Sequence, residues 1–491
     1  MRQLRLRPLP AALLASLLAA APAAGPAAAE TLGDAFRDTY VQSPRLDAER
    51  ARLRATDEQV PQALAGWRPQ LRAIGEAGIA WEREDDKSRA VTIRDANGRT
   101  DVQASSNRDA ERLNQVSGRL LAQQSLYAGG ETVAGTRRAE NQVLSGRARL
   151  AGAEQEVLLD TVEAYAGVVR ARGVLRYAND NRDRLLRYRE GARERFRVAE
   201  LTLTDVAQAD SRVAGADADI ARAESDLEAA VAEFERAVGR LPGELRPPPS
   251  APGLPASLEE ALARIADHPR LQQAAYDLEA QRDQVRVDEA QLLPEVNLVG
   301  EVGRRRQPSD NVDLRDDASI GAEVIVPLYQ RGSEYSRVRQ SKQNAIQRRY
   351  EVTDVERQVR REIITSYEAL QAARRQIVSL QEQIKAAQAA LNGTREEAIA
   401  GARTVLDVLN AELELFTAQT RRERAVEQDV VAGYRLSAAI GDLNLETLDL
   451  GEMRYDPTAN YRAVRNRWFG LDVEDPTARP APRPATPQAT N

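Results

Sequence analysis

The sequence predicts a mainly α-helical protein with a transmembrane β-barrel portion, built as a duplicated strand–strand–long helix unit. Three observations support this prediction. The chain repeats itself over most of its length. Each copy contains two segments in which apolar and polar residues alternate, as in strands with two different faces. Each copy then runs for about 70 residues without proline, which as one helix would reach about 105 Å.

The composition agrees with long helices. Of the 491 residues 42% are hydrophobic, but only 4% are aromatic and 29% are charged. This profile suits long helices and coiled coils better than the core of a compact enzyme. The chain has no cysteine, so it must rely on packing or assembly instead of disulfides.

The N-terminus has the features of a secretory signal peptide. Three arginines precede an Ala/Leu-rich run, and the small residues Ala27–Ala29 offer a cleavage site before Glu30. The alternative, a transmembrane anchor, is disfavoured because the run is short and rich in alanine. We therefore predict removal of residues 1–29, which takes the formal charge from −6 to −9. No basic excess then remains to recruit nucleic acid.

Two sequence offsets define the duplication. Ser43-Pro44-Arg45-Leu46 matches His268-Pro269-Arg270-Leu271 at an offset of 225, whereas Leu126-Tyr127 matches Leu328-Tyr329 at an offset of 202. Self-similarity on this scale indicates a duplicated structural half. The change of offset places 23 extra residues in a charged segment around residues 82–112. We expect an exposed loop there, longer than its counterpart at residues 304–317.

The offsets give a domain plan. We predict a first repeat at 30–244, a Pro-rich linker at 245–257, a second repeat at 258–446, a C-terminal extension at 447–475 and a disordered Pro-rich tail at 476–491. Strands are expected at about 70–84, 112–126, 295–304 and 318–328, and long helices at 130–240 and 332–440. Shorter helices are expected at 44–65 and 269–292, and Pro61 is placed to end the first of these early.

The expected strands differ between their two faces. In the second copy Val296, Leu298 and Val302 alternate with Asn297 and Glu301. This is the pattern of a membrane strand, although a soluble hairpin shows the same alternation. No run of about 18 apolar residues follows the signal peptide, so the exported chain is either soluble or crosses the membrane as a β-barrel. The helices favour the barrel, because a soluble coiled coil leaves the strands unexplained.

The second long helix carries an apolar seam. Its members recur at spacings of three and four: Ile377, Leu380, Ile384, Ala387 and Leu391, and then Leu406, Leu409, Leu413 and Phe416 after a turn. Such spacing is typical of a coiled coil.

Four short motifs resemble those of a known family. They are Trp67-Arg68-Pro69 before a strand, Leu126-Tyr127-Ala128-Gly129-Gly130, Val326-Pro327-Leu328-Tyr329 with Gly332, and the stretch from Gly401 to Asn410. With the duplicated order of elements, they make the chain similar to the TolC family of bacterial outer-membrane efflux and type I secretion channels. The resemblance covers the mature chain up to about Asp472.

The resemblance implies an assembly and a function. Three chains would each give four strands to a 12-stranded β-barrel in the lipid of the outer membrane, and their helices would continue as a periplasmic α-helical barrel. This homotrimer would be the passive exit duct of a tripartite efflux pump or type I secretion system. Its partners would be a periplasmic adaptor and an inner-membrane ABC or RND-type transporter. The sequence does not discriminate between drugs, secreted proteins and metals as substrates.

The resemblance also implies a gate at the periplasmic tip. Asp407 resembles the first position of the constriction and Asn410 the second, where relatives can carry another aspartate. Arg403 resembles the arginine of the latch between hairpins, with Thr204 and Asp205 as its partners. A tyrosine that joins this latch in some relatives is replaced here by Ala398. For any one of these charges, the plain alternative is a solvated helix surface.

The sequence offers no basis for catalysis, a cofactor or a metal site. It has no cysteine nucleophile, no glycine-rich phosphate loop and a single histidine, His268, which we expect at a helix start. Two other non-enzymatic functions compete with the channel. A periplasmic coiled-coil adaptor should carry one hairpin flanked by small β domains, and an adhesin stalk should lack the tandem strand–helix duplication.

Overall fold

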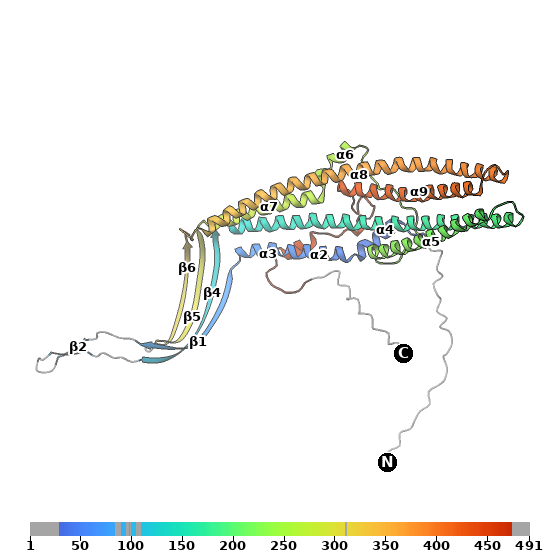
Figure 1. Cartoon of the computed structure of the whole chain (residues 1–491). Helices are drawn as coiled ribbons and strands as arrows, with labels where there is room; N and C mark the ends of the chain where they lie inside the picture. Colours follow the sequence, from blue (N-terminus) through green and yellow to red (C-terminus); the bar gives the residue numbers. More distant parts are fainter. Residues whose placement is uncertain are drawn as a thin grey trace, which may run out of the picture.

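The structure, a computed structural model, is a long helical body with a curved sheet at one end (Figure 1). It describes residues 29–83, 90–94, 98, 100–104, 110–309 and 312–473. The expected signal peptide, apart from Ala29, and the expected tail at 476–491 lie outside these residues. None of the helices within them is long and apolar enough to cross a membrane.

Two long helical hairpins form the body. The first is α4 (Glu131–Arg197) followed by α5 (Leu203–Val238), and the second is α8 (Ser333–Ile399) followed by α9 (Val405–Ala439). Both α4 and α8 contain 67 residues and therefore extend about 100 Å. The equal lengths of the paired helices confirm that the chain is a structural duplication.

Shorter helices pack alongside the long helices, mainly in the part of the body nearer the sheet. They are α1 (Leu32–Gln42), α2 (Pro44–Asp57), α3 (Gln59–Leu64), α6 (Leu258–Ala263), α7 (Pro269–Ala290) and α10 (Ala459–Val464), with short 3-10 turns at Ala65–Trp67, Ile265–Asp267 and Gly451–Met453. Helix α7 is continuous, whereas its counterpart breaks at Glu58 into α2 and α3. The break precedes Pro61, which lies inside α3. The sequence did not predict α1, which begins with a capping box of Thr31 and Asp34.

Four antiparallel strands form one sheet in the order β1-β4-β5-β6. Their bounds are β1 (Gln70–Arg83), β4 (Ala110–Ala128), β5 (Glu295–Ser309) and β6 (Val312–Ile325). The β4–β5 pairing joins the first repeat to the second. Register places Ala73, Leu120, Val302 and Ala318 in one row across the sheet, so the apolar residues share one face. The expected alternation is therefore confirmed.

The loop expected at residues 304–317 is wrong. The loop expected around residues 82–112 contains strand residues where the structure describes it, and its residues 84–89, 95–97, 99 and 105–109 lie outside the described part of the chain. Residues 304–317 belong almost entirely to β5 and β6, where Arg304 forms two hydrogen bonds of 2.7 Å with Asp316 across the strands. In the first repeat, β2 (Ala90–Arg94) and β3 (Thr100–Ala104) pair with each other inside the charged insertion. Charged residues suggested loops, but opposite charges facing each other across strands are compatible with a ladder.

The main hydrophobic core lies in the middle of the helical body. Side chains from α1, α4, α5 and α9 meet there, including Phe36, Tyr165, Phe234 and Tyr434. The hydroxyl oxygen of Tyr165 lies 2.8 Å from the carbonyl oxygens of Glu30 and Arg246. These contacts anchor the start of the chain against the linker between the repeats.

Candidate functional site at the helical tips

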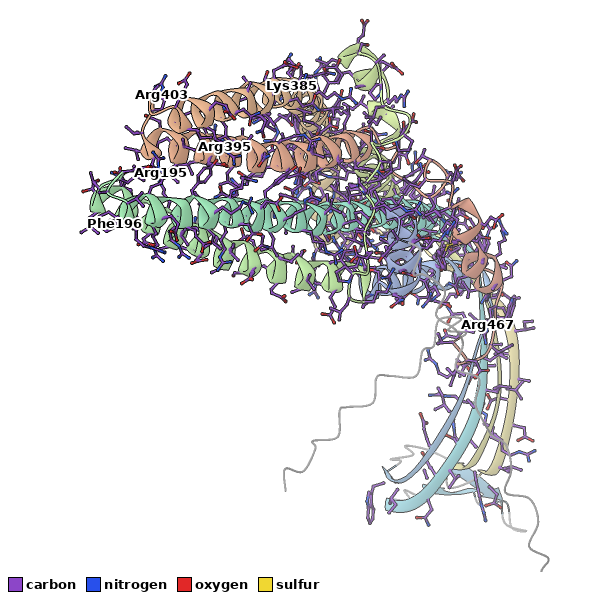
Figure 2. The ribbon with its side chains drawn as sticks, turned by 90° about the vertical axis from the view of Figure 1, so that its right-hand side faces the viewer. Arg195, Phe196, Lys385, Arg395, Arg403 and Arg467 are labelled. Carbon is purple, nitrogen blue, oxygen red and sulfur yellow. The ribbon has the colours of Figure 1, made fainter. Side chains whose placement is uncertain are left out.

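The two hairpin turns lie at the same end of the molecule, remote from the sheet. Figure 2 shows Arg195 and Phe196 at the first turn and Arg403 at the second, whereas Arg467 lies where the body meets the strands. The predicted gate and latch residues all belong to these two tips. These residues therefore lie at the end of the helical body that is remote from the sheet.

Each tip starts its second helix with the same capping box. In the first, Thr202 N and Oγ1 donate to Asp205 Oδ2 at 3.0 and 2.7 Å. In the second, Thr404 N and Oγ1 donate to Asp407 Oδ2 at the same two distances. The hydrogen bonds from the threonine hold the pKa of both carboxyls below the usual range of aspartate. Asp407 therefore has a structural function at its helix start and also stays ionised.

The turns preceding the capping boxes are also alike. Gly401 has a φ of 76° and Ala199, 202 positions earlier, has a φ of 63°. In both tips the next amide closes the turn: Glu200 N donates to Arg195 O at 2.9 Å, and Ala402 N donates to Glu397 O at 2.8 Å. The two tips thus share one backbone conformation, although only the second has a glycine at the position with positive φ.

The predicted latch is not assembled within one chain in this structure. Arg403 Nε instead donates to Glu397 Oε2 of its own hairpin at 2.9 Å. Asp205 is held by Thr202, and Thr204 is exposed in the first turn of α5. The three residues nevertheless lie at neighbouring tips of one molecular end.

The contacts that do join the two hairpins involve mostly residues that sequence reasoning missed. Arg212 on α5 donates to Asn410 Oδ1 on α9 at 2.7 Å, so Asn410 is the one predicted residue among them. Arg184 on α4 pairs with Glu412 on α9 at 2.8 Å, and the Glu412 side chain is only 1% exposed. The sequence does contain one indication of this pair, because Glu412 lies among the apolar residues of α9. An acidic side chain that is buried there needs a cationic partner.

The apolar seam of α9 differs from the prediction. Leu409 is buried as expected, but Leu406 and Leu413 are exposed. The buried stripe of α9 instead contains Val408, Glu412 and Leu415. In α8, the seam members Leu380, Ala387 and Leu391 are buried as predicted. The two leucines of α9 were assigned by spacing alone, and spacing does not distinguish a face that packs within the chain from the opposite one.

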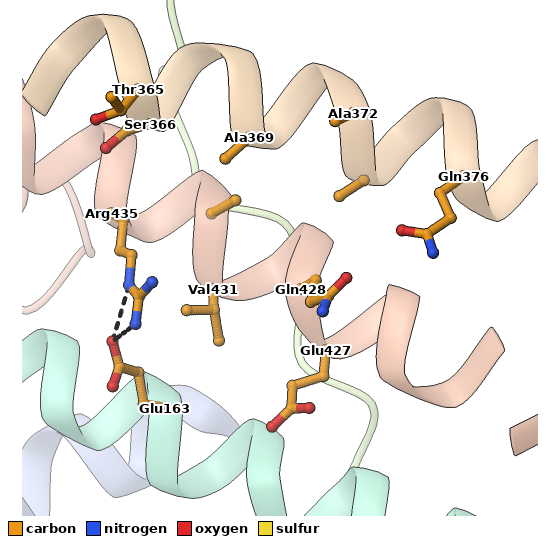
Figure 3. Close-up of a pocket in the computed structure, with 12 residues that line it drawn as sticks. Glu163, Thr365, Ser366, Ala369, Ala372, Gln376, Glu427, Gln428, Val431 and Arg435 are labelled. Atoms are coloured by element: carbon orange, nitrogen blue, oxygen red, sulfur yellow. Dashed lines mark hydrogen bonds and ion pairs between the residues drawn. The ribbon is translucent and has the colours of Figure 1, made fainter. Parts of the chain in front are cut away.

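Further charge pairs tie α4 to α9 towards the middle of the body. Arg170 pairs with Glu427 at 2.8 Å, and Arg435 pairs with Glu163 at 2.8 Å. Figure 3 shows the second pair at the wall of a groove of about 640 Å³ between α4, α8 and α9. The hairpins are therefore joined by charge pairs from the body to the tip.

His268 occupies the helix start that the sequence predicted. It caps α7, and its Nδ1 accepts a hydrogen bond from the Arg270 amide at 3.1 Å. Burial, with a smaller contribution from the Arg270 charge, lowers the pKa of His268 to about 4. The imidazole is therefore neutral near pH 7, with Nδ1 as an acceptor.

A family of known proteins has this architecture. The family model described as outer membrane efflux protein matches residues 37–240 and 258–442, one range within each predicted repeat. The chain belongs to the outer membrane efflux protein family. The expected resemblance to TolC channels is thereby confirmed, and of the functions left open by the sequence the channel is supported over the adaptor.

Individual members of the outer membrane efflux protein family agree with this. The chain is 33% identical to the outer membrane efflux protein BepC of Brucella suis over 91% of this chain and 92% of that protein. It is 24% identical to the outer membrane protein TolC of Escherichia coli over 60% of this chain and 63% of TolC. The crystal structure of the outer membrane protein VceC from Vibrio cholerae shares the fold, with a TM-score of 0.71, 19% identity and coverage of 84% and 96%.

Proposed function

We propose that three copies of this chain form a passive exit duct through the outer membrane, without an enzymatic step. The strands of the trimer close a 12-stranded barrel in the lipid, and the long helices carry the duct across the periplasm. The duct receives its substrate from an inner-membrane ABC or RND-type transporter through a periplasmic adaptor. The chain reaches the outer membrane after removal of residues 1–29.

The open edges of the sheet are the main support for this proposal. In the described sheet, β1 and β6 each pair with a neighbour on one side only. Large apolar side chains project from the sheet into solvent, among them Leu71, Val302 and Ile320, the last 79% exposed. Backbone groups at an open edge cannot remain unpaired in lipid, and four strands are too few to close a barrel. Pairing of β1 with β6 of another copy removes both edges.

The tips form the gate of this duct. Three copies of Asp407 around the threefold axis give a ring of negative charge that favours cations, and Asn410 provides the second position. Arg403 supplies the latch with Thr204 and Asp205 when neighbouring chains bring the tips together. The ion pair between Arg403 and Glu397 has both side chains more than half exposed, so this arginine is available to exchange partners.

Opening requires the second hairpin to move away from the first. The polar contacts of Arg212 with Asn410 and of Arg184 with Glu412 then have to separate, because they connect α9 to α5 and α4. An adaptor that binds the separated arrangement better shifts the equilibrium towards the open duct.

Disulfide crosslinking tests the trimer directly, because the chain contains no cysteine of its own. One cysteine replaces Ala73 on β1, and a second replaces Ala318, Ile320 or Ala322 on β6 in three separate variants. Within one chain β1 and β6 are three strand spacings apart, about 14 Å, which is too far for a disulfide. Oxidation in outer membranes should therefore give dimers and trimers in at least one variant.

A matched variant controls for random collisions. Cysteines at Ala73 and Leu120 face each other on paired strands of the same chain and should crosslink only within it. If all three β1–β6 variants stay monomeric while this control forms its internal bond, pairing of β1 with β6 of another copy in these three registers is refuted.

A further inference from the structure

The last described residues, Arg467–Val473, form a compact loop that we call the C-terminal loop. The guanidinium of Arg467 donates from Nε to the carbonyl of Phe469 at 3.2 Å and from Nη1 to that of Asp472 at 3.0 Å. Gly470 makes the turn with a φ of 114°, and a Cβ there would lie 2.7 Å from Arg467 Nη2. The loop is therefore folded around one arginine, and its glycine is required.

The C-terminal loop is fixed where the strands begin. Arg68, two positions before β1, donates to the carbonyl of Arg467 at 2.9 Å. The same guanidinium lies over the ring of Trp468, 4.8 Å from its centroid. Figure 2 shows Arg467 at the junction of the helical body and the strands. The C-terminal loop is therefore held at the level where the strands leave the helical body.

Most side chains of the C-terminal loop are apolar and project into solvent. Trp468 is 57% exposed, Phe469 86% and Leu471 97%, and Val473 is also exposed. Clustered exposed apolar side chains of this kind mark an interaction site. Two further aromatic residues stand exposed at the strand ends, Trp67 before β1 and Tyr127 near the end of β4. Aromatic residues gathered at one level are typical of the boundary between a bilayer and water.

We propose that the C-terminal loop binds lipid, seated at the headgroup boundary of the periplasmic leaflet of the outer membrane. The inference rests on the proposed function, which places the strand bases at that boundary. The rings of Trp468 and Phe469 take the interfacial position, and Leu471 and Val473 reach the first carbons of the acyl chains. The Arg68 guanidinium adds a cation beside the rings, suited to lipid phosphate.

Two observations favour lipid over a second copy of the chain as the occupant. The loop is continuous with the strand bases, where the apolar face of the sheet begins. Its apolar side chains are exposed at nearly every position, whereas packing against a protein surface would use one face and leave the other polar. Burial against a second copy is therefore an alternative that the experiment must detect.

Tryptophan fluorescence can test the inference because the chain has three tryptophans, Trp67, Trp81 and Trp468. The variant with Trp67→Phe and Trp81→Phe leaves Trp468 as the only reporter. The trimer is reconstituted into vesicles of phosphatidylethanolamine and phosphatidylglycerol that contain nitroxide-labelled phosphatidylcholine. A nitroxide close to the headgroup should quench at least half of the Trp468 emission, and one at the chain end should quench less. Aqueous iodide should quench Trp468 weakly.

The matched control keeps Trp81, on the apolar face of β1, by replacing Trp67 and Trp468 with phenylalanine. If lipid nitroxides quench Trp81 but not Trp468, the strands are in the bilayer and the lipid-binding loop is refuted. Strong iodide quenching would then place the loop in water, and protection from both quenchers would place it against a second copy. If lipid quenches neither tryptophan, the proposed membrane position of the strands fails first.

Discussion

The Nε atom of Arg184 lies 2.8 Å from Oε2 of Glu412, a carboxylate whose side chain is almost fully buried. The pair connects the first helix of one hairpin with the second helix of the other. A buried charge that loses its partner is destabilised by several kcal/mol, so this contact strongly favours the arrangement in which the two hairpins lie together. The equivalent acidic residue of the first repeat, Asp210, pairs instead with Arg193 of its own hairpin at 2.7 Å.

Replacing Glu412 with glutamine should favour the open duct. The neutral amide keeps the shape but loses the charge-assisted bond to Arg184, a weakening of about 2 kcal/mol or roughly thirtyfold in the closed-to-open ratio. Single-channel recording in planar bilayers should show more frequent and longer openings than the natural protein. Asp210→Asn is the control, because its ion pair does not cross between hairpins. Equal behaviour of the two variants would exclude the Arg184–Glu412 pair from gating.

Replacing Asp407 with alanine should weaken block of the duct by trivalent cations such as cobalt hexammine at least about tenfold, because three charges leave the ring. Since hydrogen bonds from Thr404 lower the pKa of Asp407, block of the natural channel should stay constant from neutral pH down to the ordinary range of aspartate. Titration of the blocking ion at several pH values measures both effects.

Thr404→Ala separates the charge of Asp407 from its capping function. It removes the side-chain cap of the same helix and leaves the Asp407 carboxylate in place, so both variants lose about 1 kcal/mol of helix stability. Only the Asp407 variant should lose the blocking site. Undiminished block in Asp407→Ala would remove this residue from the constriction.

The substitutions Ala199→Gly and Gly401→Ala should change the stability of their tips in opposite directions. Both have positive φ, which costs alanine about 1 kcal/mol and glycine almost nothing. Gly401→Ala should therefore destabilise its tip by about 1 kcal/mol, since a Cβ there would meet no neighbour and the backbone is the only source of strain. Ala199→Gly should stabilise its tip by somewhat less, because glycine also gains entropy in the unfolded chain.

Amide hydrogen exchange at the two turns measures how each substitution changes local stability. Amide protection at the first turn should rise in Ala199→Gly and fall at the second turn in Gly401→Ala. Changes of the same sign in both variants would contradict the strain that we assign to Ala199.

The strands could be predicted because their signals are local, and the duplication because the same motifs occur twice in the sequence. Alternation along one strand fixes which side chains share a face, and it placed Val296, Leu298 and Val302 correctly. The capping boxes of Asp205 and Asp407 are equally local, with the threonine three positions before the aspartate, but the sequence-based prediction assigned these aspartates only to the gate and the latch. By contrast, Arg304 and Asp316 looked like loop residues, because their compatibility with strands depends on facing each other across a hairpin.

The contacts between the hairpins could not be predicted because they also depend on residues that are distant in the sequence. Arg184 and Glu412 meet only because α4 and α9 pack at one particular register, set by side chains along both helices. No spacing within either helix carries that register. An acidic residue in the apolar stripe of α9 signals that some cation is near, and the structure was needed to identify Arg184 as that cation.

The acid stability of the protein should depend on its one histidine. The pKa of His268 is about 4 in the folded chain, below its ordinary value near 6.5, so the unfolded chain binds the proton first. Stability should therefore fall as the pH decreases from about 6.5 to about 4, by roughly 3 kcal/mol at most per chain, and this contribution should level off below. His268→Ser supplies the cap that Ser43 provides in the first repeat but does not titrate. Thermal unfolding followed by circular dichroism should show a smaller loss over this pH range in the variant, and an unchanged loss would assign acid sensitivity to other groups.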